Sequence, residues 1–156
     1  MKLSEIFKPQ LIISNLKAHD KKGVLEELSQ VITEQNPSLN KRSLLQVLLE
    51  RERLGSTGIG DGIALPHGKL AELSNLLISF GRSMNGLDFD SIDEQPVYLF
   101  FLLLAPENSA GMHLTALAKI SRMLKDANFR QRLMGAKSRK EIYKVIMDMD
   151  EELQFL

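Results

Sequence analysis

The sequence predicts an α/β fold, because stretches with helical periodicity alternate with short apolar stretches that are typical of strands. The clearest expected strands are residues 76–80 and 97–105. The second is apolar on both faces, as expected for a central strand that is covered on both sides. No internal repeat, low-complexity segment or long linker interrupts the 156 residues, so we expect one domain.

The N-terminal half contains two expected helices after a short strand at residues 11–16. The first helix covers 20–35, with Asp20 as its N-cap, and an Asn-Pro pair ends it. The second covers 40–53, with Asn40 as its N-cap and Gly55 as its terminating glycine. Residues 63–66 form a short strand-like stretch, and the polar residues 81–96 are expected to connect the two main strands.

The C-terminal third is expected to be helical. Apolar residues recur at helical spacing over 112–124. A short helix begins at Asp126 or Asn128 and continues through Leu133. Ser138 and Glu141 form a capping-box pattern that opens a last helix through about residue 149.

Composition limits the possible functions. The 20 basic and 20 acidic residues cancel, which argues against a nucleic-acid binder with its usual basic surface. No cysteine is present, so disulfides, thiolate catalysis and cysteine-based metal sites are excluded. Charges and a proline stand near the N-terminus where a signal peptide would be apolar. The longest apolar run, 97–105, is far shorter than the ~20 residues of a spanning helix. We expect a soluble, cytoplasmic protein without membrane insertion.

Glycines are concentrated in one part of the chain: five of the ten lie within residues 55–68. This stretch ends in G-I-A-L-P-H-G-K. Glycines let a ligand approach the backbone closely, and consecutive backbone N–H groups in such turns bind anions. An ordinary loop with tight turns is an equally good interpretation. The stretch matches neither a P-loop nor a dinucleotide-binding fingerprint.

His67 is the candidate nucleophile within this stretch. The preceding proline fixes the backbone, the following glycine leaves space beside the ring, and a neutral imidazole can form a covalent intermediate. The residues alone also allow a purely structural histidine.

Two further residues are candidates for the same site. His113 opens a helix shortly after the central strand, where ligands of α/β sheets gather, although a solvent-facing histidine is the alternative. Arg51 lies in the charged run E-R-E-R, which is either a solvated helix end or a means of holding a guanidinium against a phosphoryl group. We interpret His19 as a surface residue. The three histidines are too widely spaced for a metal-binding motif, and we expect no metal or other cofactor.

Residues 51–70, R-E-R-L-G-S-T-G-I-G-D-G-I-A-L-P-H-G-K-L, resemble the signature of one protein family. It comprises the IIA proteins of the fructose, mannitol and nitrogen branches of the bacterial phosphotransferase system. G-S-T-G-I-G with P-H-G-K-L is most similar to the nitrogen-type members. Residues 95–106 and the histidine of the following helix also fit, so the resemblance covers nearly the whole chain, 1–156, as one IIA type-2 domain.

The resemblance implies a mixed, roughly five-stranded sheet flanked by helices on both faces. It also implies the roles of the site residues: His67 accepts a phosphoryl group, His113 supports it, Arg51 steadies the phosphoryl charge, and the phosphate pocket is shaped by Thr57, Gly58 and Gly68. The implied donor is an HPr-like phosphocarrier protein. The implied output is control of partner proteins, potassium-uptake regulators among them.

Two alternatives remain open at this point. The chain could be a sugar-branch IIA component that passes phosphate to a separate IIB protein. It could also be a regulatory binding module that is never phosphorylated.

Overall fold

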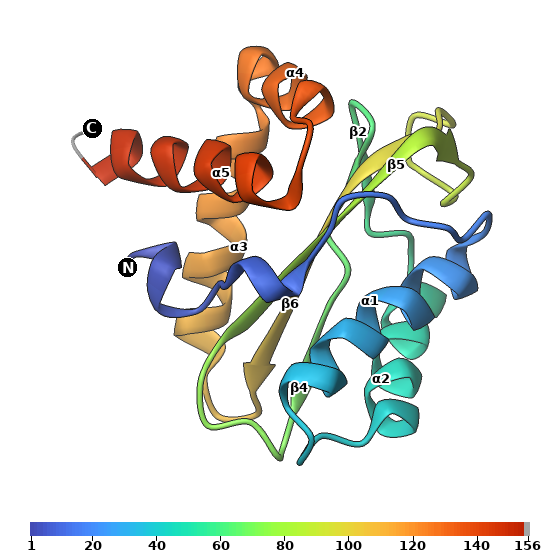
Figure 1. Ribbon diagram of the computed structural model, residues 1–156. Helices are drawn as coiled ribbons and strands as arrows, with labels where there is room; N and C mark the ends of the chain where they lie inside the picture. Colours follow the sequence, from blue (N-terminus) through green and yellow to red (C-terminus); the bar gives the residue numbers. More distant parts are fainter. Residues whose placement is uncertain (155–156) are drawn as a thin grey trace.

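The computed structural model describes residues 1–154 and confirms the α/β class (Figure 1). Two short 3-10 helices, Leu3–Glu5 and Pro9–Leu11, lead into the first strand. The strands are β1 Ile12–Ile13, β2 Gly58–Gly60, β3 Ile63–Ala64, β4 His67–Leu70, β5 Leu77–Leu87 and β6 Val97–Pro106. The helices are α1 Lys21–Gln35, α2 Lys41–Arg53, α3 Ala110–Leu124, α4 Ala127–Gly135 and α5 Arg139–Gln154.

One mixed sheet organises the chain. Five strands follow the order β1-β5-β6-β3-β2, and β4 pairs with β6 beyond the end of β3. β6 is parallel to β3 and β4 but antiparallel to β5. The roughly five-stranded mixed sheet that the family resemblance implied is therefore confirmed, with β4 as a sixth strand. β6 is the central strand, and residues 99–105 are all buried, as its apolar sequence predicted.

Helices cover both faces of the sheet (Figure 1). α1 and α2 lie on one face, and α3, α4 and α5 lie on the other. The predicted N-caps are confirmed, because Asp20 accepts a hydrogen bond from Gly23 N at 2.8 Å and Asn40 accepts one from Ser43 N at 3.0 Å. Asp126 caps α4 in the same way at 3.1 Å. Within residues 1–154, no helix is long and apolar enough to cross a bilayer.

The structure corrects two expected strands. β1 has only two residues, because the 3-10 helix ending at Leu11 takes the place of the start of the predicted strand 11–16. β5 extends to Leu87, whereas residues 81–96 were expected to be a polar connection. The prediction failed because the polar residues after position 80, Arg82 among them, were taken as a sign of a connection. Arg82 is in fact buried in the strand, and its guanidinium donates to backbone carbonyls at the end of α4.

The break between β3 and β4 brings His67 to the sheet. Both strands run parallel to β6, but Leu65 and Pro66 interrupt them. Pro66 has no N–H to donate, while its carbonyl still accepts from Leu103 N at 2.9 Å. His67 is the first residue of β4 and lies beside Leu103. The sheet therefore continues through the break, and it fixes the backbone of the candidate nucleophile.

Gly68 is needed for the packing of α2 on β4. A Cβ at this position would lie 2.6 Å from Cγ1 of Val47, which is too close for any real contact. We expect Gly68→Ala to lower the free energy of unfolding by about 1–3 kcal/mol, because the side chain of Val47 or the helix that carries it must shift to relieve the overlap. Urea unfolding measures the change. Gly135→Ala is the matched control, since its added methyl would meet nothing within 4 Å. Equal stabilities of the two variants would contradict the packing argument.

Candidate functional site

His67 is half-buried, and backbone geometry fixes its tautomer. Its Nδ1 lies 2.8 Å from the carbonyl oxygen of Leu65. A carbonyl only accepts hydrogen bonds, so Nδ1 carries the proton in the neutral ring. Nε2 then holds an unshared electron pair and is the nucleophilic atom.

Arg51 meets this nitrogen from the last turn of α2. Its Nε donates to Nε2 of His67 at 3.3 Å, and its Nη1 donates to the carbonyl of Gly55 at 2.8 Å. The second contact anchors one arm of the guanidinium beside the glycine-rich loop. The remaining nitrogen, Nη2, makes no protein hydrogen bond among residues 1–154. Arg51 therefore places positive charge and a free donor next to the lone pair of His67.

His113 lies against the same ring from the first turn of α3. The two imidazoles are edge to face, with centroids 5.3 Å apart and planes at 78°. Gly68 faces α2, so strand alternation turns its neighbour His67 toward the face that α3 covers. His113 is only 7% exposed, and its Nε2 has no hydrogen-bond partner in the described chain. A buried polar atom without a partner is costly, and such atoms gather at functional sites.

The pKa of both imidazoles is lowered from the ordinary value of 6.5. For His67 the main cause is burial, and the charge of Arg51 adds to it, while the hydrogen bond to Leu65 and the charge of Glu52 oppose the shift. For His113 burial again comes first, followed by the charges of His67 and Lys69. The site thus favours neutral, nucleophilic imidazole at neutral pH.

These shifts predict a pH dependence. We expect both rings to titrate with midpoints below 6.5 in an NMR titration of labelled histidine. Because the unfolded chain binds these protons more readily, the stability they contribute is complete above about pH 6.5 and declines as the pH falls below it. A midpoint for His67 above 6.5 would contradict the account of burial and Arg51.

The three predicted pocket residues occupy different positions. Gly58 and Gly68 flank the site on β2 and β4. The N–H of Gly58 is not available to a phosphoryl oxygen in this arrangement, because it donates to Oγ of Ser56 at 3.0 Å. Thr57 is buried, and both its N–H and its hydroxyl donate to the carboxylate of Glu52. Thr57 thus acts on the site through the loop it holds rather than through a free donor.

Sequence reasoning missed several neighbours of the site. Glu52 was read together with Arg51 as part of a charged helix end, yet its carboxylate is buried. Leu54, next in the chain to that run, is 86% exposed, and the helical spacing of apolar residues did not reveal it, because it faces away from the core. Leu114 beside His113 is 68% exposed. Large exposed leucines beside a reactive group are typical of a docking surface.

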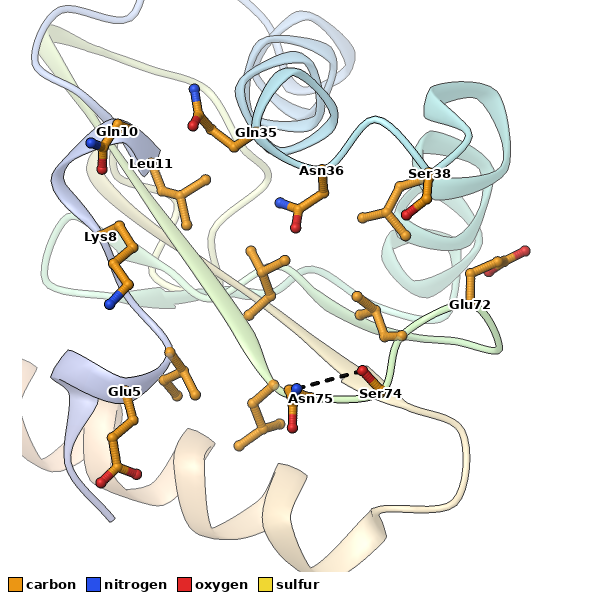
Figure 2. Close-up of a pocket in the computed structure, with 15 residues that line it drawn as sticks. Glu5, Lys8, Gln10, Leu11, Gln35, Asn36, Ser38, Glu72, Ser74 and Asn75 are labelled. Carbon is orange, nitrogen blue, oxygen red and sulfur yellow. Dashed lines mark hydrogen bonds between the residues drawn. The ribbon is translucent and has the colours of Figure 1, made fainter.

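A separate hollow lies outside this site (Figure 2). It is a cleft of about 360 Å³ between the N-terminal segment, the end of α1 and the turn from β4 to β5. Figure 2 shows amide and carboxylate side chains around it, including Gln10, Asn36, Glu72 and Asn75. None of the predicted site residues lines it. Within residues 1–154, no three histidine, aspartate or glutamate side chains are placed to hold a metal ion.

The fold and the site together define a class of protein: an α/β domain in which a half-buried histidine lies beside an arginine and a second histidine. The family described as "Phosphoenolpyruvate-dependent sugar phosphotransferase system, EIIA 2" matches residues 5–149. The chain belongs to this family, and the resemblance seen in the sequence is confirmed. Membership of this family implies that the chain is a carrier in phosphoryl transfer.

Individual relatives place the chain within the family. It is 41% identical to the nitrogen regulatory protein of Bradyrhizobium diazoefficiens, over 94% of this chain and 95% of that protein. It is 35% identical to the fructose-specific EIIABC component of Bacillus subtilis, over 97% of this chain but 24% of that longer protein. The crystal structure of the nitrogen regulatory protein IIA-Ntr of Neisseria meningitidis superposes with a TM-score of 0.86 at 34% identity, covering 92% of this chain and 98% of that one.

Proposed function

We propose that this protein is a phosphocarrier of a nitrogen-type phosphotransferase system that accepts a phosphoryl group on Nε2 of His67. The observation that carries the proposal is the hydrogen bond from Nδ1 of His67 to Leu65, because it leaves Nε2 unprotonated and therefore nucleophilic. The donor is an HPr-like phosphohistidine protein, which supports a cytoplasmic location. The nitrogen branch is favoured by the 41% identity to a nitrogen regulatory protein of matching length.

The transfer step uses groups that are already in place. Nε2 of His67 attacks phosphorus in line as the P–N bond to the donor imidazole breaks, and the bonding electron pair returns to the donor ring. The proton on Nδ1 stays where it is. The phosphorylated ring is a cation, and the Leu65 carbonyl at 2.8 Å stabilises that charge through its hydrogen bond. No proton transfer by the protein is required.

Arg51 has to exchange partners during the step. Its Nε donates to the lone pair that must attack, so this contact protects Nε2 in the resting protein. When the phosphoryl group arrives, the guanidinium moves to the equatorial oxygens, where charge is spread in the transition state. Its bond to Gly55 limits that movement to a short rotation. His113 supplies a second donor through Nε2, which has no other partner in the described chain.

An open site suits transfer between two proteins, because a donor histidine has to reach His67. The exposed Met112 and Leu114 adjoin His113 in sequence, the exposed Leu54 lies three residues after Arg51, and all three offer apolar area for docking. Ile59 is also exposed, whereas Ile63 and Leu65 belong to the core. In its phosphorylated state the same surface carries a phosphoryl group with about two negative charges on a cationic ring, a net gain of about one negative charge, which changes the partners it can bind. Regulation of target proteins, including potassium-uptake regulators, follows from this charge change.

The test is uptake and return of phosphate. The protein is incubated with phosphoenolpyruvate, an Enzyme I-like protein and an HPr-like donor, and the product is assayed for acid-labile phosphate. We expect one phosphoryl group per chain, and we expect its return when unphosphorylated donor is added in excess. A donor whose own histidine is replaced by alanine is the control. Absence of uptake from several HPr-like donors would favour the unphosphorylated binding module.

A further inference from the structure

Glu52 is a buried carboxylate that the transfer chemistry described above does not use. It lies in the last turn of α2, directly after Arg51, and its side chain is 4% exposed. One oxygen accepts the N–H of Thr57 at 3.1 Å, and the other accepts the Thr57 hydroxyl. A carboxylate buried without partners would be strongly destabilising, so Glu52 depends on the groups that surround it. Three contacts to its carboxylate are made in the structure, two of them by Thr57.

Lys21 supplies the third contact. Its Nζ lies 3.1 Å from Oε1 of Glu52, the oxygen that accepts the N–H of Thr57. The same Nζ lies 3.3 Å from Asp90 and 4.8 Å from the ring centroid of Phe89. It stands at the start of α1, so the charge of Glu52 is compensated by a different element. The ion pair joins the ends of two helices to the segment that follows β5.

A continuous set of hydrogen bonds leads from Glu52 to the reactive ring. Glu52 holds Thr57, the carbonyl of Thr57 accepts from Leu65 N at 2.9 Å, and the carbonyl of Leu65 holds Nδ1 of His67 at 2.8 Å. The N–H and the carbonyl of Leu65 are therefore both held by hydrogen bonds. The direction of this carbonyl decides which nitrogen of His67 carries the proton.

We propose that Glu52 is a positioning residue for His67: through Thr57 and Leu65 it fixes the ring orientation and tautomer that expose Nε2. The effect on transfer rests on the function proposed above, but the effect on the ring does not. A carboxylate is needed because it accepts three donors at once. The amide of a glutamine has one accepting oxygen, so its NH₂ group would face at least one of these donors.

The test compares Glu52→Gln with Glu50→Gln. Glu50 lies on the same helix two residues earlier, it is exposed, and its replacement removes the same charge. The first readout is the tautomer of His67, obtained from the ¹⁵N shifts of the ring in histidine-labelled protein. The second is the single-turnover rate of transfer from a phosphorylated HPr-like donor.

We expect Glu52→Gln to raise the fraction of the Nε2–H tautomer and to slow transfer by about 10- to 100-fold, as small misplacements of reacting groups do. Glu50→Gln should match the wild type in both readouts. A folded Glu52→Gln protein that matches Glu50→Gln in tautomer and rate would overturn the proposal.

A second pair of variants covers the case in which Glu52→Gln does not fold. Thr57→Ser keeps the hydroxyl that donates to Glu52, and Thr57→Val removes it at nearly constant shape. We expect Thr57→Ser to retain the wild-type tautomer and Thr57→Val to shift it; identical ring spectra would overturn the proposal. If the wild type takes up no phosphate, the proposed function fails, while the tautomer comparison still decides the role of Glu52.

Discussion

His67→Ala is expected to abolish phosphoryl uptake from a phosphorylated HPr-like donor, because it removes the nucleophilic Nε2. No neighbouring group can replace it. Among the described residues, the neighbouring groups are His113, which is buried, and the guanidinium of Arg51, which is not a nucleophile. Loss of acid-labile phosphate after incubation with the donor proteins measures the effect.

Two other histidine variants sharpen this prediction. His113→Ala should still become phosphorylated but about 100-fold more slowly, which is the usual cost of removing one donor to developing charge. His19→Ala is the matched control, since His19 is exposed and precedes α1. Labelling of His67→Ala at the rate of His19→Ala would remove His67 as the acceptor.

Arg82→Met is expected to lower the free energy of unfolding by about 2–4 kcal/mol, the cost of leaving buried carbonyls without donors. Nη1 of Arg82 donates to Leu133 at 2.8 Å, Ala136 at 2.6 Å and Met134 at 3.3 Å. Its Nε donates to Ser14 at 3.0 Å. The carbonyls at the end of α4 have no intrahelical partners, and they form the negative end of the helix dipole. Methionine keeps the apolar stem but removes every donor.

Urea unfolding, with Arg132→Met as the control, measures this effect. Arg132 lies on α4 as well, but its side chain is exposed, so its loss should change stability little. An Arg82→Met protein as stable as the control would mean that water replaces the guanidinium at no cost. The contacts between β5 and α4 would then not depend on Arg82.

Local patterns were sufficient for most of the helices. Asp20 and Asn40 act as N-caps at the predicted positions because capping depends on the residue and its immediate neighbours. The apolar sequence of 97–105 likewise predicted a central strand, since burial on both faces leaves no polar position. α5 extends to Gln154, whereas the sequence predicted an end at about residue 149. Helix ends are the least reliable part of such predictions.

Residues whose roles depend on distant partners were not predictable in the same way. Arg82 reads as a surface charge until α4, some fifty residues further along, provides carbonyls for it. Glu52 reads as a solvated helix end until Lys21 and Thr57 enclose it. In both cases the residue type shows that a charge is present, but the sequence does not show which groups compensate it.

The candidate site lies between these cases. His67 and Arg51 belong to one continuous run, so a sequence signature could connect them. His113 comes to the same place only because β4 pairs with β6 and α3 follows β6. The nucleophilic nitrogen depended on a single backbone carbonyl, that of Leu65, whose direction no residue pattern encodes.

The most direct test of the account is the position of the phosphoryl group on the ring. Protein labelled with ¹⁵N-histidine is phosphorylated by its donor and examined by ¹⁵N and ³¹P NMR at alkaline pH, where phosphohistidine persists. The account predicts phosphorus on Nε2 of His67, with Nδ1 unsubstituted opposite the Leu65 carbonyl. Phosphorus on Nδ1 of His67, or on any other residue, would contradict it.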